Sequence, residues 1–150
     1  MKLTIEKVHS KLDGFDIYSL FKEDLDTILL DSVRDRETLG RYSFIGVNCF
    51  LKFKSKNGMC NTFGEAYAGD TFEELNKILK EYYMKNNTQL PFVAGGIGYF
   101  SYDLGRELEE LPNIAKEDID IPHCCYNFYD NIIIIDNLKK NTYVSALKKI

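Results

Sequence analysis

Two neighbouring polar residues at the end of an apolar stretch are the first candidates for ligand chemistry in this sequence. Asp31 and Ser32 lie in the segment 27–33, which is short, apolar and typical of a buried strand. In one interpretation, Asp31 accepts hydrogen bonds from the ammonium group of a ligand and Ser32 supplies another polar contact. In the other, Ser32 starts a turn and Asp31 stays in water. The chemistry of these two residues alone favours the second interpretation.

A glycine-rich segment at 95–98 raises the question of nucleotide binding. The dinucleotide fingerprint G-x-G-x-x-G fits Gly96 and Gly98, but Ser101 stands where the third glycine belongs, and no long helix follows directly. The P-loop, zinc-protease and nucleophile-elbow motifs do not occur. We therefore expect these glycines to be steric, so that a neighbouring strand, domain or ligand approaches closely.

Aromatic and basic residues give little support for a nucleic-acid site. Tyr42 and Phe44 share one face of a predicted strand, as stacking residues of RNA-binding sheets do. However, 19 basic residues stand against 23 acidic ones, which gives a net charge of -4 and a pI near 5.2. An acidic chain does not attract phosphates. We expect the two rings to lie in a core or at a domain interface.

The four cysteines are expected to be reduced and mostly buried. No C-x-x-C pair occurs, and the only histidines are His9 and His123, so the sequence predicts no metal site. An Asn57-Gly58 turn would place Cys60 opposite Ser55, which argues against a Cys49–Cys60 disulfide. The sequence likewise offers no catalytic residues.

Periodicity predicts more strands than helices. Apolar residues at helical spacing indicate a short helix capped by Asp16 and a longer helix that begins with a capping box from Thr71 to Glu74. A third short helix is predicted over 104–111. Strands are predicted over 2–7, 27–33, 92–102, 126–135 and 142–147, and in a hairpin between 42 and 63.

These elements predict an α+β fold. We expect mostly antiparallel, sandwich-like sheets with about two to three helices packed against them. The 150 residues suit one domain. The longest apolar run, 132–135, is far shorter than the ~20 residues of a membrane helix, and the N-terminus lacks a signal peptide, so we expect a cytoplasmic protein with no membrane partner.

An ordered series of motifs resembles the N-terminal domain of two chorismate-utilising enzymes, anthranilate synthase component I and aminodeoxychorismate synthase component I. The motifs are LLDS at 29–32, GRYSFIG at 40–46, PFVAGGIGY at 91–99, YDLGR at 102–106, EELP at 109–112 and YD at 129–130. The stretch from 102 to 119 looks more like the aminodeoxychorismate (para-aminobenzoate, folate) branch than the tryptophan branch.

The resemblance implies a non-catalytic domain with scaffolding and regulatory roles. In the family, chorismate is aminated with Mg²⁺ present, using ammonia from a glutamine amidotransferase subunit, and the catalytic and metal-binding groups lie in a C-terminal domain that we expect to be absent from these residues. The domain itself would need no cofactor. Alternatives are the feedback-regulatory domain of anthranilate synthase component I and a free-standing small-molecule sensor module.

The resemblance also implies a tryptophan pocket. By the family pattern, Asp31 would pair with the ligand ammonium and Ser32 would hydrogen-bond it, with Tyr42 and Ser43 nearby. The acidic position is usually Glu, and the other wall of the pocket would belong to the missing domain, so we expect free tryptophan to bind this chain weakly. We also expect self-association through an apolar face around 95–102, left uncovered without that domain.

Overall fold

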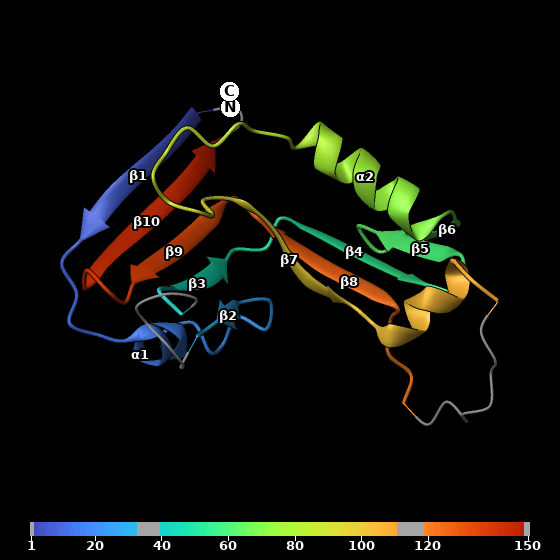
Figure 1. The fold of residues 1–150 in the computed structure, drawn as a ribbon, viewed down its shortest axis with the longest axis horizontal. Helices are drawn as coiled ribbons and strands as arrows, with labels where there is room; N and C mark the ends of the chain where they lie inside the picture. Colours follow the sequence, from blue (N-terminus) through green and yellow to red (C-terminus); the bar gives the residue numbers. More distant parts are fainter. Residues whose placement is uncertain (1, 33–39, 111–118, 149–150) are drawn as a thin grey trace. The chain divides into compact units, whose positions relative to one another are not determined.

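A computed structural model describes residues 2–32, 40–110 and 119–148, which form two compact units (Figure 1). The first unit comprises residues 1–50, 84–97 and 128–150, and the second comprises 51–83 and 98–127. Three helices and ten strands lie in the described part of the chain, and the strands form two five-stranded antiparallel sheets. The predicted α+β class is therefore confirmed. None of the described helices is long and apolar enough to cross a membrane.

The first sheet has the strand order β1-β10-β9-β3-β2. Its edge strand β1 pairs with β10 over its whole length, with Leu3 opposite Leu147. The chain after β1 forms helix α1 before entering β2, and β9 and β10 make a hairpin in the middle of the sheet. The elements of this sheet are β1 (Lys2–Val8), α1 (Gly14–Ser19), β2 (Ile28–Leu30), β3 (Tyr42–Val47), β9 (Asn131–Asp136) and β10 (Asn141–Lys148).

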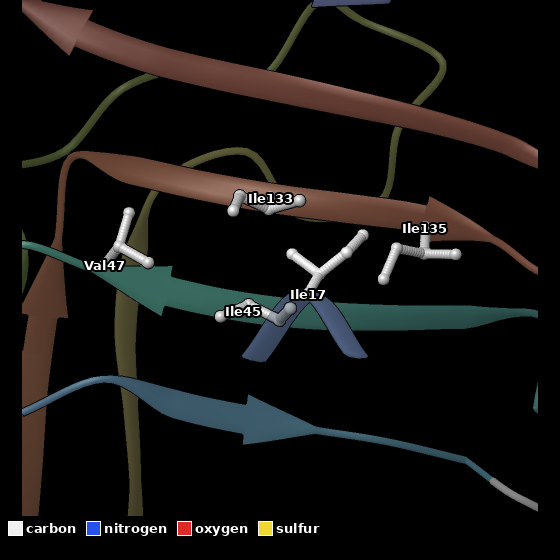
Figure 2. Close-up of a cluster of buried hydrophobic side chains, with 5 residues drawn as sticks. All are labelled: Ile17, Ile45, Val47, Ile133 and Ile135. Carbon is white, nitrogen blue, oxygen red and sulfur yellow. The ribbon is translucent and has the colours of Figure 1, made fainter. Parts of the chain in front are cut away.

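Both faces of this sheet are apolar at its centre, because β9 is apolar at four consecutive positions. Alternate residues of β3 and β9 pack with Ile17 of α1 on one face (Figure 2). On the other face, Ile132 and Ile134 pack with the fully buried Tyr129. A strand that is buried on both faces reads as a continuous apolar run. The first cluster consists of Ile17, Ile45, Val47, Ile133 and Ile135.

The second sheet has the order β6-β5-β4-β8-β7. The turn between β4 and β5 is the predicted hairpin, since Asn57 and Gly58 have φ of 52° and 73° and Ser55 lies opposite Cys60. None of the four cysteines forms a disulfide bond. The elements here are β4 (Leu51–Lys56), β5 (Met59–Thr62), β6 (Glu65–Ala68), helix α2 (Thr71–Glu81), β7 (Gly95–Phe100), the 3₁₀ helix η1 (Tyr102–Glu107) and β8 (Cys124–Tyr129).

Gly98 confirms the close approach expected at 95–98, and Gly46 shows a second close approach that the sequence analysis did not predict. A Cβ on Gly98 would lie 2.0 Å from the carbonyl oxygen of Cys125, and a Cβ on Gly46 would lie 2.7 Å from the ring of Tyr129. Real Cβ atoms essentially never come within 3.0 Å of a heavy atom of this kind. The strands can lie this close only because neither position has a side chain.

Four local predictions were wrong in detail, and two of them concern helix caps. The N-cap of α1 is Asp13, with Asp16 completing the capping box from the third helical position. The N-cap of α2 is Asp70, which accepts hydrogen bonds from the backbone of Phe72 and Glu73, whereas Thr71 is already helical. The acidic caps therefore lie three residues and one residue before the predicted positions, and they satisfy the orphan N–H groups at the start of each helix.

The other two wrong predictions concern a strand and a helix. The segment predicted as one strand over 126–135 forms two strands. It divides at Asp130 into β8 and β9, which belong to different sheets. The short helix predicted over 104–111 is the 3₁₀ helix η1, which starts two residues earlier, and position 111 lies outside the described residues.

Candidate functional site

A cleft of about 850 Å³ opens beside the edge strand β2 of the first unit. Asp31, Ser32 and Tyr42 line it, so three of the four residues predicted for a ligand site meet in one place. The fourth, Ser43, is 1% exposed and does not line the cleft. The complete lining is Leu29, Leu30, Asp31, Ser32, Arg41, Tyr42, Phe44, Pro91 and Phe92.

Aromatic rings form one wall of the cleft. Tyr42 and Phe44 stack at 6.1 Å between ring centroids, because alternate residues of β3 point to the same face. Phe92 meets Phe44 edge to face at 5.6 Å and 89°. The wall offers a rigid apolar surface against which a flat ring can pack.

The Asp31 carboxylate is held by a hydrogen-bonded chain from the opposite side. The hydroxyl of Ser43 donates to Asp31 Oδ1 at 2.5 Å, and the side-chain amide of Asn137 donates to Ser43 Oγ at 2.9 Å. Asn137 follows β9 in the sequence. Sequence reasoning missed Asn137, since only the pairing of β3 with β9 brings it to this place.

Arg41 adds a cation that sequence reasoning also missed. Its guanidinium forms two hydrogen bonds with Asp136, at 3.1 and 2.7 Å, and lies 4.8 Å from the centre of the Tyr42 ring. Burial alone would raise the pKa of Asp136, but hydrogen bonds from Arg41 and from the backbone of Lys139 and Leu138 outweigh it and hold that pKa below the usual value of an aspartate. Arg41 keeps 30% of its side chain exposed at the cleft.

A second polar cluster lies in the other unit. Glu107 accepts hydrogen bonds from the backbone of Asn57 at 3.1 Å and from Thr71 Oγ1 at 2.8 Å, and its Oε1 lies 3.1 Å from His123 Nδ1. Thr71 is wholly buried and also bonds Ser55. We assign this cluster to the attachment of η1 to the β4–β5 hairpin.

The cleft combines a carboxylate, a guanidinium and an aromatic wall. The Asp31 carboxylate suits an ammonium group and the aromatic wall suits a flat apolar side chain, whereas the Arg41 guanidinium is already paired with Asp136. Among the described residues, no three Asp, Glu, His or Cys side chains gather where they could hold a metal ion.

Comparison with known proteins gives consistent relatives, although no family model matches the chain. Anthranilate synthase component 1 of Acetivibrio thermocellus is 34% identical over 148 residues, which is 95% of this chain and 30% of that protein. Aminodeoxychorismate synthase component 1 of Escherichia coli (strain K12) is 46% identical over 52 residues, which is 35% of this chain and 12% of that protein.

A solved structure has the same fold. Anthranilate synthase component I from Streptococcus pneumoniae TIGR4 matches with a TM-score of 0.61 and 23% identity, over 87% of this chain and 28% of that one. The chain thus spans less than a third of the length of each of these proteins.

Proposed function

Because the chain is homologous over most of its length to component I of anthranilate synthase and of aminodeoxychorismate synthase, we propose that it is the non-catalytic N-terminal domain of such a component I. Its role is to provide a scaffold and one wall of a pocket for a free amino acid, with tryptophan as the ligand. The chemistry on chorismate, and the Mg²⁺ it requires, are assigned to the remainder of the longer protein.

The observation that carries this proposal is the meeting of Asp31, Ser32 and Tyr42 at one cleft. Asp31 would accept hydrogen bonds from the ligand ammonium group, and Ser32 would add a polar contact. The aromatic wall of Tyr42, Phe44 and Phe92 would cover one side of an indole ring. The open side of the cleft leaves much of the ligand in water, which supports weak binding by this chain alone.

The product of the parent enzyme has two candidates. The motifs at 102–119 and the identity of 46% over 52 residues with an aminodeoxychorismate synthase favour 4-amino-4-deoxychorismate, which is our first candidate. The identity of 34% over 148 residues with an anthranilate synthase favours anthranilate as the second. In either branch, a glutamine amidotransferase subunit would supply the ammonia.

Chromatography of the reaction products tests both points. The full-length gene product, given chorismate, ammonia and Mg²⁺, should form 4-amino-4-deoxychorismate, and formation of anthranilate would select the second candidate. The 150 residues alone should leave chorismate unchanged. Turnover by these residues alone would refute the assignment of a non-catalytic domain.

Calorimetry tests the pocket. In the full-length protein, Asp31→Asn should weaken tryptophan binding about tenfold or more, because an ammonium loses its charged acceptor. Glu6→Gln, which removes an exposed carboxylate from β1 of the same sheet, is the matched control and should bind as the wild type does. Equal binding by all three proteins would contradict the proposed pocket.

Self-association is the remaining part of the proposal. Tyr99, Phe100 and Tyr102 expose 42%, 47% and 90% of their surface, which supports an uncovered apolar face at 95–102. Sedimentation of the 150-residue chain should depend on concentration. A single monomeric species at high concentration would contradict this point.

A further inference from the structure

We infer that Ser43 and Asn137 form a relay that positions the Asp31 carboxylate for an ammonium group, although neither residue touches the ligand. The inference rests on the proposed amino-acid pocket and adds two positioning residues to it. The relay runs from Asn137 after β9, through Ser43 of β3, to Asp31 after β2, so that three neighbouring strands hold one carboxylate.

The chemistry of the groups fixes the direction of the relay. The amide nitrogen of Asn137 can only donate, so Ser43 Oγ accepts its hydrogen bond. An ionised carboxylate can only accept, so the single hydroxyl proton of Ser43 is committed to Asp31 Oδ1. Oδ1 is thereby occupied from the buried side, and the carboxylate keeps acceptor capacity for a donor that arrives in the cleft.

Asn137 is itself held firmly. Its backbone N–H donates to the carbonyl of Arg41 at 2.7 Å. Asp136, the residue before Asn137, accepts hydrogen bonds from the Arg41 side chain and from the backbone N–H groups of Leu138 and Lys139. Because both the strand end and the turn are fixed, the amide of Asn137 has a defined position from which to orient Ser43.

Burial excludes a direct role for Ser43. Its side chain is 1% exposed and faces away from the cleft, on the face of β3 that bears Ile45 and Val47. Asn137 is half-buried, and neither Ser43 nor Asn137 lines the cleft, so we expect any effect of these two residues on the ligand to pass through Asp31. A change in the relay should therefore weaken the binding of ligands that carry an ammonium group, whereas a purely structural role would affect all ligands of the cleft equally.

The experiment compares two ligands on the full-length protein. L-tryptophan carries an ammonium group, whereas indole-3-propionic acid has the same ring and carboxylate without it. Asn137→Ala should weaken tryptophan binding about five- to tenfold and leave indole-3-propionate binding unchanged. Asn137→Asp should weaken tryptophan binding further, because a second carboxylate competes for the hydroxyl proton of Ser43. Ser43→Ala should resemble Asn137→Ala.

Lys139→Ala is the matched control, since its exposed side chain lies on the same turn outside the relay. Asn137 does not have a positive φ, so alanine fits its backbone. An equal loss for both ligands, or no loss for either, overturns the relay. If Asp31→Asn also leaves tryptophan binding unchanged, the proposed pocket fails and the relay fails with it; if only Asp31→Asn weakens binding, the relay alone is wrong.

Discussion

Replacing Gly98 with alanine tests how closely β7 and β8 pack within the second unit. The added Cβ would lie 2.0 Å from the carbonyl oxygen of Cys125 and 2.7 Å from Cα of Tyr126, and both are backbone atoms that no rotamer change can move. Restoring even the 3.0 Å limit for real Cβ atoms requires the backbones to separate by about 1 Å.

Overpacking costs typically ~1–3 kcal/mol, and a clash against backbone places Gly98→Ala at the upper end. Alanine recovers roughly 0.5–1 kcal/mol through its smaller loss of backbone entropy. The expected net loss in the free energy of unfolding is therefore about 2–2.5 kcal/mol. With a urea dependence of ~1.5–2 kcal/mol per M, the unfolding midpoint should fall by about 1–2 M.

Urea unfolding followed by circular dichroism measures this loss. Gly64→Ala is the matched control, because Gly64 has φ of +87° with nothing within 4 Å of an added Cβ. It should lose only the ~1 kcal/mol of a strained backbone conformation. A Gly98→Ala protein as stable as the wild type, or no less stable than Gly64→Ala, would refute the reasoning.

Three further predictions concern the ion pair, a thiol and a helix cap. Because the pKa of Asp136 is lowered in the folded protein, its carboxylate stabilises the fold fully above about pH 4, and this contribution is lost as the pH falls through the folded pKa. Arg41→Gln should therefore lower the free energy of unfolding in urea by about 1–3 kcal/mol at pH 7 and by less at pH 3. An equal loss at both pH values would contradict this coupling between the ion pair and the pH. Burial raises the pKa of the Cys124 thiol to about 12. After iodoacetamide treatment at pH 8, mass spectrometry should therefore find this thiol unalkylated in the native protein and alkylated in guanidinium. Rapid alkylation of the native protein would show that the region around Cys124 opens. Asp70→Ala should destabilise α2 by about 1 kcal/mol in thermal unfolding while Asp70→Asn retains most of the stability, and equal losses would exclude a capping role.

Local patterns predicted the elements that are defined by nearby residues. The Asn57-Gly58 turn needs only its own two positive φ values, so its sequence determined both the hairpin and the register of Ser55 with Cys60. The division at Asp130 was missed because β8 and β9 are both apolar and together read as one strand. Only the sheet to which each half pairs distinguishes them.

For the cleft too, local sequence patterns predicted the nearby residues but not the partners that are distant in the sequence. Their motifs made Asp31, Ser32 and Tyr42 candidates for a ligand site, and all three line the cleft. Arg41 lies in one of those motifs, but its partner Asp136 is 95 positions away, and Asn137 is 94 positions from Ser43. Contacts of this separation depend on the pairing of β3 with β9, which no local periodicity encodes.

The pairing of β1 with β10 has a consequence for the order of events on the ribosome. β1 precedes every other element of its sheet in the sequence, yet its hydrogen-bonding partner β10, with Lys148 opposite Lys2, follows all of the other described strands. Until β10 is synthesised, β1 lacks its neighbour in the sheet, because β10 is the one strand next to it among the residues that the structure describes. Nascent chains must therefore keep this strand from pairing with other polypeptides, and stalled or truncated products that lack β10 should be recruited by chaperones and prone to aggregation.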